Sequence, residues 1–332
     1  MSVHAVPQPQ SVPLLDVRNL FVRFSDDGTG FDVVRGISFS VASGKTLCLV
    51  GESGSGKSMT ALALLRLAPQ GSRVRADRLA LDGLDTTDLS ESAIRELRGR
   101  QCAMIFQEPM TSLNPVLRIG DQVAEPLMAH MGMPRAEARD HALEALRQVG
   151  IPAAAERMRD YPHQLSGGMR QRVMIAMALV CGPRLLLADE PTTALDVTIQ
   201  GQILDLLHAR TVERGMGLVL ITHDLNVVAE TADEVCVMYA GQIVEQAPVA
   251  EIFARPLHPY TQGLMEAAPS RERRGTRLIT IAGTVPPARR MPPGCAFAPR
   301  CPRAMPACSE TPPEMYEPVP GHTARCLLCA GT

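Results

Sequence analysis

The segment 51–58, which reads Gly-Glu-Ser-Gly-Ser-Gly-Lys-Ser, constrains the fold of this chain more than any other. It fits the pattern G-x-x-x-x-G-K-[ST] of a phosphate-binding loop, in which glycines let the backbone approach a polyphosphate. The flanks support this interpretation, because residues 46–50 read as a buried strand and 59–67 as an apolar helix. The sequence therefore predicts a nucleotide site that consists of Gly51, Glu52, Ser53, Gly54, Ser55, Gly56, Lys57, Ser58 and Met59.

Composition limits the remaining possibilities. The 332 residues, of which 45% are hydrophobic, can bury one large domain with an appendage. A net charge of −2 argues against a broad nucleic-acid surface, and we predict no nucleic-acid partner. Residues 1–13 are rich in Pro and Gln, which predicts a flexible N-terminus without a secretion signal. Because no apolar run is long enough to span a bilayer, we expect the chain to stay in the cytosol.

Two strands are predicted before the loop, over 14–24 and 31–41, with a turn cluster at 26–30 between them. They form an antiparallel element. Phe24 or Phe31 can present a ring to an adenine, although an aromatic residue in a strand is also a normal core residue. Phe24 is the preferred adenine candidate. Further predictions are a strand over 79–81, a helix over 90–98 and a strand over 102–106.

Polar side chains follow three of the predicted parallel strands. Gln107 follows the strand 102–106, Asp189 and Glu190 end the strand 185–190, and His223 follows the strand 218–222. Ligands of open parallel sheets bind at the carboxyl ends of the strands. We therefore expect Asp189 to serve Mg²⁺, Glu190 to orient or deprotonate the attacking water, Gln107 to reach the metal or that water, and His223 to contact the γ-phosphate.

The middle of the chain has a helical pattern. Over 119–150, Pro134 suits a first-turn position, and Gly150 can terminate the last helix, whose apolar face consists of Ala138, Ala142, Leu146 and Val149. Residues 165–172 then open an apolar helix that runs to Val180. Ser166, Gly167 and Gly168 fit either a simple N-cap and turn or a second anion site at the helix N-terminus. Asp196, in the loop after Glu190, is a candidate cross-subunit contact.

Taken in order, these motifs resemble the complete motif set of ABC transporter ATPases. The resemblance implies an α/β P-loop cassette with an antiparallel β subdomain, a helical subdomain and a small Cys-rich C-terminal region. It implies that Ser58, Gln107 and Asp189 bind Mg²⁺ and that Glu190 is the catalytic base, with Lys57, Gln107 and His223 also catalytic. It further implies that Ser166 and Gly168 face an ATP molecule held by a second ATPase subunit.

Three further segments, 108–115, 169–172 and 257–261, resemble the ATPases of dipeptide and oligopeptide importers. That group also includes nickel and glutathione importers. The resemblance implies a non-identical partner ATPase, two membrane permease subunits and an external solute-binding protein. It places the chain peripherally on the cytoplasmic face of the bacterial cytoplasmic membrane. A soluble ABC ATPase, or a redox-regulated protein with ATP as a conformational cofactor, is the alternative.

Five of the nine cysteines lie in the last segment, among prolines and arginines that cannot form an apolar core. Four thiolates on one metal centre would hold this segment together, and Cys295, Cys301, Cys308 and Cys326 are the predicted ligands. Their spacing does not distinguish zinc from a 4Fe-4S cluster or from free thiols. Resemblance to importer ATPases with an iron–sulfur cluster in this tail favours 4Fe-4S, and Cys329 can replace Cys326. The predicted domains are 14–255, with a helical insertion over 108–182, and 256–332.

Overall fold

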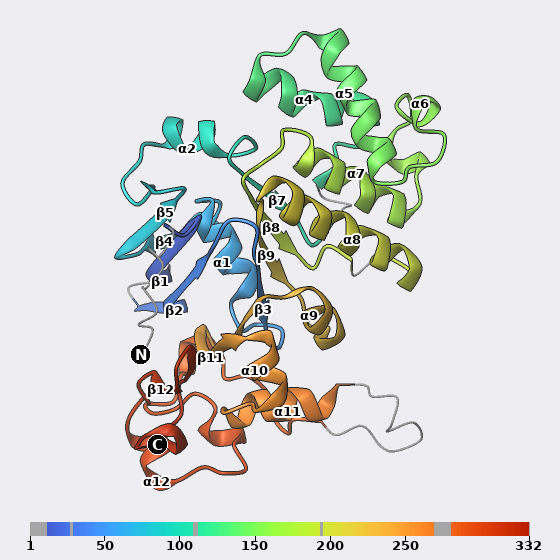
Figure 1. Cartoon of the computed structure of the whole chain (residues 1–332). Helices are drawn as coiled ribbons and strands as arrows, with labels where there is room; N and C mark the ends of the chain where they lie inside the picture. The colour runs from blue at the N-terminus through green and yellow to red at the C-terminus, as the bar shows by residue number, and fades with distance from the viewer. Residues whose placement is uncertain (1–11, 27–28, 109–111, 193–194, 269–279, 332) are drawn as a thin grey trace, which may run out of the picture.

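The computed structural model describes residues 12–26, 29–108, 112–192, 195–268 and 280–331. Some sequence predictions fall outside these ranges and stay predictions. They concern residues 1–11 of the N-terminus, 27–28 of the first turn, 109–111 of the motif after Gln107, Thr193 and Ala194, and 269–279 of the C-terminal region. The described residues form two β-sheets with helices around them (Figure 1).

The first sheet is antiparallel and lies near the N-terminus. Its strand order is β2-β1-β5-β6, and β4 also pairs with β1. The antiparallel pairing of β1 with β2 confirms the predicted element, and Phe24 lies opposite Phe31 in its register. The strands are β1 (Leu15–Asp26), β2 (Thr29–Val41), β4 (Ser72–Arg75), β5 (Arg78–Leu81) and β6 (Leu84–Asp85).

The second sheet carries the strand ends on which the predicted site depends. Its order is β12-β13-β11-β10-β3-β9-β8-β7, and the run from β10 to β7 is parallel. The strands are β3 (Thr46–Val50), β7 (Cys102–Ile105), β8 (Leu185–Asp189), β9 (Gly217–Ile221), β10 (Glu234–Tyr239), β11 (Gln242–Pro248), β12 (Tyr316–Val319) and β13 (His322–Ala324). Strands β10 to β13 were not predicted from the sequence.

Both faces of the parallel run are buried, which explains why its strands are continuous apolar sequences. Successive side chains of a strand point to opposite faces. In β3, Cys48 and Val50 accordingly pack into the core on the side of the long helices, and Leu47 and Leu49 into the core shared with the first sheet. The central sheet thus separates two apolar layers.

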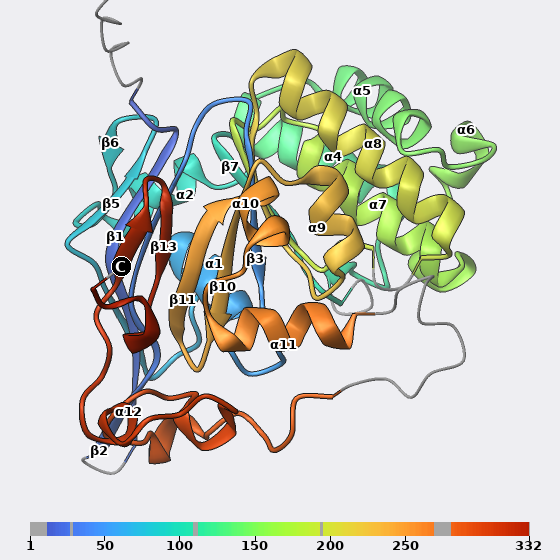
Figure 2. The ribbon, with the colours of Figure 1, turned by 60° about the horizontal axis from the view of Figure 1, so that its bottom comes forward.

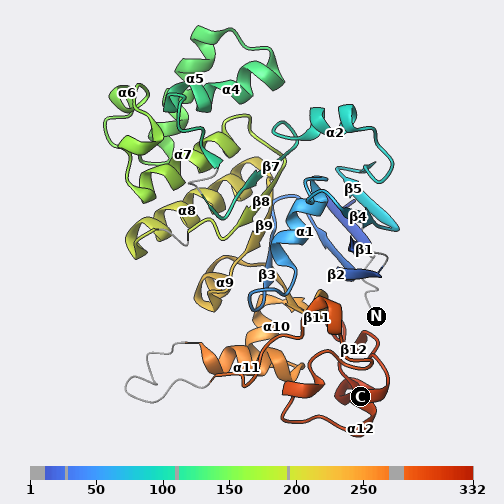
Figure 3. The same cartoon turned by 180° about the vertical axis from the view of Figure 1, so that it is seen from behind.

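The helices surround this sheet. They are α1 (Lys57–Leu64), α2 (Glu91–Leu97), α4 (Ile119–Met131), α5 (Arg135–Gln148), α6 (Ala154–Arg157), α7 (Gly167–Leu179), α8 (Val197–Arg214), α9 (Leu225–Thr231), α10 (Val249–Ala254), α11 (Pro259–Ala267) and α12 (Pro306–Glu310). Short 3₁₀ turns are η1 (Pro162–Gln164), η3 (Ala288–Arg290), η4 (Ala298–Arg300) and η5 (Leu327–Cys329). Helix α1 lies between the two sheets, and α4 to α7 lie at the opposite end of the molecule from α11 and α12 (Figures 1 and 3).

The predicted helices are present with small shifts in their ends. Helix α1 begins at Lys57 rather than Met59 and ends at Leu64 rather than Leu67, because Arg66 has a positive φ of 52° that a helix does not allow. Pro134 is the N-cap of α5 rather than a first-turn residue. The predicted apolar face of α5 is buried, and Gly150, with φ of 71°, follows the helix. Ser166 caps α7, which is one of the two alternatives that the sequence left open.

The C-terminal region wraps around the edge of the central sheet. Strand β13 pairs with β11, so that the last residues of the chain extend a sheet whose central strand precedes the phosphate loop (Figure 2). The buried pair Glu245 and His322 reinforces this edge, with 2.8 Å between His322 Nε2 and Glu245 Oε1. Glu245 also accepts hydrogen bonds from the backbone N–H groups of Leu257 and His258.

Candidate nucleotide site

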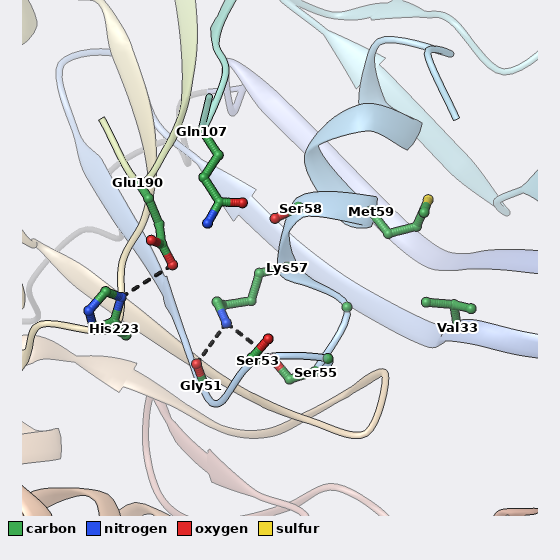
Figure 4. Close-up of a pocket in the computed structure, with 12 residues that line it drawn as sticks. Val33, Gly51, Ser53, Ser55, Lys57, Ser58, Met59, Gln107, Glu190 and His223 are labelled. Atoms are coloured by element: carbon green, nitrogen blue, oxygen red, sulfur yellow. Dashed lines mark hydrogen bonds and ion pairs between the residues drawn. The ribbon is translucent and has the colours of Figure 1, made fainter. Parts of the chain in front are cut away.

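A cavity of about 470 Å³ opens at the carboxyl ends of the parallel strands. The phosphate loop, the first residues of α1 and the ends of three strands line it, together with one residue of β2. Its lining residues are Val33, Gly51, Ser53, Gly54, Ser55, Gly56, Lys57, Ser58, Met59, Gln107, Glu190 and His223. Figure 4 shows the side chains of Gln107, Glu190 and His223 on one side of the loop and those of Val33 and Met59 on the other.

The loop needs glycine at two positions for different reasons. At Gly51, with φ of 152°, a Cβ would lie 2.2 Å from the carbonyl oxygen of Met238 in β10. Gly56, the N-cap of α1, has φ of 101°, a conformation that costs side-chain-bearing residues free energy. The loop therefore packs tightly on β10 and turns its backbone into the N-terminus of α1, where free N–H groups favour an anion.

Lys57 lies inside the loop and is almost fully buried. Its ammonium donates to the carbonyl oxygen of Gly51 at 2.7 Å and to Ser55 Oγ at 3.4 Å (Figure 4). It also donates to the carbonyl oxygen of Glu52, 3.0 Å away. Burial lowers the pKa of Lys57, an effect that the nearby carboxylates of Glu190, Asp189 and Glu52 oppose. A bound polyphosphate would add negative charge next to this ammonium and stabilise its charged form.

A hydrogen bond from the Ser58 hydroxyl to the Asp189 carboxylate links α1 to the end of β8. Asp189 is buried, and its Oδ1 atom has no hydrogen-bond partner among the described residues. Burial raises the pKa of this carboxyl group, while the hydrogen bond from Ser58 and the charge of Lys57 lower it. A buried carboxylate oxygen without a partner beside a serine hydroxyl fits a hard cation such as Mg²⁺, which prefers oxygen ligands.

Glu190 and His223 form a pair at the mouth of the cavity. His223 Nδ1 lies 3.2 Å from Glu190 Oε1, and the two residues follow the neighbouring strands β8 and β9. The His223 side chain is 64% exposed and that of Glu190 15%, so that a ligand can displace the imidazole without opening the core. Gln107, after β7, points its amide toward Ser58 (Figure 4). The structure places Gln107, Glu190 and His223 together at this edge of the sheet, and their roles stay predictions.

Other predicted residues lie outside this cavity. Ser166 Oγ accepts from Met169 N–H at 3.3 Å and Asp196 Oδ1 accepts from Ile199 N–H at 3.0 Å, so that both are N-caps, of α7 and α8. Ser166, Gly167, Gly168 and Asp196 do not line the cavity. Phe24 and Phe31 stack on each other with centroids 5.8 Å apart, and neither lines it. Arg289 lies over the Phe31 ring. Their roles stay predictions.

Two groups of contacts to the loop were not predicted. Val33 enters the cavity because β2 passes beside the loop, and a lone valine in a strand gives no local signal of this. Tyr260, in α11, accepts a hydrogen bond at its hydroxyl from the backbone N–H of Glu52, 2.8 Å away. The ring of Tyr260 packs on those of Tyr239 and Phe297, with centroids 4.7 and 5.4 Å apart. The C-terminal region therefore contacts the phosphate loop directly.

The four predicted cysteine ligands lie in one part of the C-terminal region. Cys295 interacts electrostatically with Cys308 and Cys301, and Cys326 with Cys295 and Cys301. Each of the four sulfurs accepts a backbone N–H, for example that of Met305 at Cys308 Sγ, 3.5 Å away. Burial nevertheless raises the pKa of Cys326 to about 11.

Side chains of His, Cys, Asp and Glu are those that could hold a metal ion together. Among the described residues, no group of three or more His, Cys, Asp or Glu side chains is arranged to hold a metal ion. The four thiols are near enough to affect one another's charge, and the residues that the structure describes give no support to a bound metal centre. In the described part of the chain, no helix has the length and apolarity that crossing a membrane requires.

The fold and the cavity define a P-loop protein whose phosphate loop faces two carboxylates and a histidine at the same sheet edge. Sequence comparison gives two family matches. The ABC transporter family matches residues 34–193, and the family called oligopeptide/dipeptide transporter, C-terminal region, matches residues 244–308. The two matches together span the phosphate loop, Glu190 and the first three C-terminal cysteines.

Similar proteins cover nearly the whole chain. The oligopeptide transport ATP-binding protein AppD of Bacillus subtilis is 49% identical over 316 residues, covering 95% of this chain and 96% of that protein. A probable peptide ABC transporter ATP-binding protein of Sinorhizobium fredii is 52% identical and covers 96% of each. The dimeric ATP-binding cassette MJ0796 bound to ADP and Pi superposes with a TM-score of 0.64, at 27% identity over 71% of this chain and 98% of that one. The chain belongs to the ABC transporter ATP-binding proteins that carry the oligopeptide/dipeptide transporter C-terminal region.

Proposed function

We propose that this ABC ATPase hydrolyses ATP to power the import of dipeptides or oligopeptides across the cytoplasmic membrane. The observation that carries the proposal is the carboxylate of Glu190 at the mouth of the cavity that the phosphate loop forms. Peptides are the solutes that the names of the similar proteins give. Nickel, glutathione or another small solute is the alternative within the same group.

In the reaction, a water oxygen attacks the γ-phosphorus of ATP, and the bond from that phosphorus to the β–γ bridging oxygen breaks. ADP leaves with the bond's electron pair. Of the two water protons, one stays on the inorganic phosphate and the other passes through Glu190 to the solvent. Lys57 and the loop N–H groups bind the phosphates. Ser58 and Asp189, with Gln107, would hold Mg²⁺, which when bound neutralises phosphate charge. These oxygen ligands fit that ion.

Glu190 and His223 act on the water and on the γ-phosphate. Glu190 accepts the proton of the attacking water or orients it, and its position after β8 keeps it beside Lys57. His223 Nδ1 already lies on Glu190, so that the imidazole can exchange this contact for a γ-phosphate oxygen when ATP enters. The loss of the γ-phosphate would restore the contact between His223 and Glu190.

Partner subunits complete the proposed machine. Ser166, Gly167, Gly168 and Asp196 lie away from this chain's own cavity, which supports a role at the nucleotide of a second, non-identical ATPase. Two permease subunits would contact the cleft of about 280 Å³ beside Phe106, whose lining includes Leu67, Met104, Met174 and Met177. An external binding protein would deliver the solute. The chain would then lie peripherally on the cytoplasmic face of the membrane.

The chain is proposed to contain two parts. We retain 14–255 as the ATPase domain with a helical insertion over 108–182, and 256–332 as the C-terminal region.

We further propose a 4Fe-4S cluster on Cys295, Cys301, Cys308 and Cys326, with zinc as the alternative metal and Cys329 as the alternative fourth ligand. Backbone N–H groups on all four sulfurs support thiolate ligands, because such hydrogen bonds stabilise the charged form.

The test of the ATPase proposal is Glu190→Gln in the purified chain. We expect phosphate release to fall by at least about 100-fold, the usual contribution of a general base, while the Kd for ATP stays within about threefold of the wild-type value. The matched control is Glu213→Gln, which removes an exposed carboxylate of α8 and should leave both values unchanged. Undiminished hydrolysis in Glu190→Gln would contradict the proposed role.

A further inference from the structure

One ion pair joins the C-terminal region to the phosphate loop. The guanidinium of Arg300, at the end of η4, donates two parallel hydrogen bonds to the carboxylate of Glu52, with Nη1–Oε2 at 2.6 Å and Nη2–Oε1 at 3.0 Å. The Arg300 side chain is only 5% exposed and that of Glu52 30%. The two residues are 248 positions apart in the sequence. Paired bonds of this kind fix both the position and the orientation of the carboxylate.

Other groups besides Glu52 also hold the Arg300 side chain in place. Its Nε donates to the carbonyl oxygen of Ala282 at 2.8 Å and its Nη2 to that of Ile281 at 3.1 Å. Its Nη1 also donates to the hydroxyl of Tyr239, 3.3 Å away. The hydrogen bond to Glu52 is the largest of the causes that raise the pKa of Arg300. The arginine is thus preorganised by the C-terminal region and by β10.

Glu52 occupies a sensitive position. It is the second residue of the phosphate loop, its carbonyl oxygen accepts from Lys57, and its N–H donates to Tyr260. Its side chain does not line the cavity. A carboxylate on this loop without a cationic partner would repel the phosphates of a nucleotide, because its negative charge would lie close to theirs in a partly dehydrated site. Arg300 both neutralises the charge of Glu52 and holds its carboxylate outside the cavity.

We propose that Arg300 is a positioning residue of the nucleotide site, through which the C-terminal region sets the affinity of this chain for ATP. The inference rests on the proposed ATPase function and extends it to a residue far from the loop. It assigns a task to the segment between Cys295 and Cys301 that does not depend on a metal: folding of this segment places the guanidinium on the loop. A chain in which the segment is displaced would bind ATP weakly and still carry every residue of the cavity.

The experiment compares wild type, Arg300→Gln, Glu52→Gln and the double variant, with KM, kcat and the Kd for ATP measured on each. Arg300→Gln should raise KM and Kd about tenfold, the effect of an unpaired like charge beside the phosphates, with kcat within about twofold. Glu52→Gln measures what the loss of the ion pair alone does to the Kd for ATP and is the reference for the double variant. The double variant should recover to within about threefold of wild type, because no carboxylate is left to repel the nucleotide.

Arg290→Gln is the matched control, since Arg290 is an exposed arginine of the same region, and it should change none of these constants. Unchanged KM in Arg300→Gln would overturn the proposal. A double variant as weak as Arg300→Gln would also overturn it, because a loss of structure or of metal near Cys301 does not recover when Glu52 is neutralised. Wild-type protein that neither binds nor hydrolyses ATP would contradict the proposed function instead.

Discussion

Glu190 has a backbone φ of 48°, in the left-handed region that residues with a side chain seldom occupy. Its N–H donates to the carbonyl oxygen of Ile221 in β9, so that the neighbouring strand holds the conformation. Strained backbone of this kind typically costs about 1–3 kcal/mol and is concentrated at functional sites. Here it turns the Glu190 carboxylate from the strand axis toward the cavity, one residue after β8 ends at Asp189.

Asp189 offers a test at the same scale. Its carboxyl group is buried, which raises its pKa above the ordinary value of 3.8. Folding therefore holds this proton more tightly than the unfolded chain does, and stability falls as pH rises from 3.8 through the folded-state pKa. We expect Asp189→Asn to raise the unfolding free energy of the nucleotide-free protein at neutral pH, by about 1 kcal/mol, while ATP hydrolysis falls.

Thermal melts of the nucleotide-free chain over a series of pH values would check this prediction. The gain in Asp189→Asn should shrink as pH falls toward 3.8, where the wild-type carboxyl group is neutral as well. Asp205→Asn, which changes an exposed carboxylate of α8, should show no such gain. A variant that is less stable than wild type at neutral pH would show that the hydrogen bond with Ser58 outweighs the burial of the charge.

At the scale of elements, polar N-caps begin many of the helices that surround the site. Ser90, Ser166, Asp196 and Asp224 each accept a backbone N–H of the helix that follows. Such a cap is typically worth about 1 kcal/mol. Helix α11 differs, because its N-cap is the imidazole of His258, whose Nδ1 accepts from the N–H of Tyr260 at 3.0 Å. The helix that contacts the phosphate loop thus begins at a titratable group.

His258 is buried, and burial lowers its pKa from 6.5 to about 3. The unfolded chain takes up a proton below pH 6.5 that the folded chain refuses, so stability is lost as pH falls from 6.5 through 3. Between pH 6.5 and about 5.5 this group alone should lower the unfolding free energy by about 1 kcal/mol. His258→Asn keeps a side-chain cap and removes the titration, so its stability should fall less over this range.

Chemical denaturation at the two pH values would measure the difference, with His208→Asn on the exposed face of α8 as the control. The control should retain the full wild-type pH dependence. An equal change in unfolding free energy with pH for wild type and His258→Asn would mean that the imidazole becomes protonated in the folded state without cost. That outcome would also remove the cap as a source of acid sensitivity for α11.

At the scale of the whole molecule, the C-terminal region is part of the central sheet rather than a separate appendage. Strand β13 extends β11, and the buried pair Glu245 and His322 joins the two strands. Removing one member of a buried, hydrogen-bonded pair is costly, since the other is left without a partner. The sheet edge, the aromatic contacts of Tyr260 and the Arg300–Glu52 pair therefore all fix the region to the ATPase fold.

Metal content tests the remaining part of that region. We expect an anaerobic preparation of the full chain to show a broad absorption band near about 400 nm, with about four irons and four sulfides per chain. Cys301→Ser should lose the band, and Cys181→Ser, which changes a cysteine outside the region, should keep it. About one zinc per chain without a visible band would instead identify a structural zinc site. The absence of both iron and zinc from the wild-type preparation would contradict the proposed centre.

Much of the site was determined by the sequence alone. The phosphate loop and its flanking strand and helix are local patterns, and the apolar strands 102–105, 185–189 and 217–221 are buried on both faces. Because parallel strands that share a sheet end at one edge, Gln107, Glu190 and His223 were expected to lie together. Their positions along the chain were sufficient for that expectation, since each follows its strand within two residues.

Only the tertiary structure decided which distant residues reach the loop. Val33, Tyr260 and Arg300 come to Glu52 or to the cavity through the pairing of strands and the packing of rings, and no local pattern predicts such contacts. The same holds for strands β10 to β13. The physical reason is range: capping, turn and alternation signals act over a few residues, whereas the partner of Glu52 lies 248 residues away and is chosen by the whole fold.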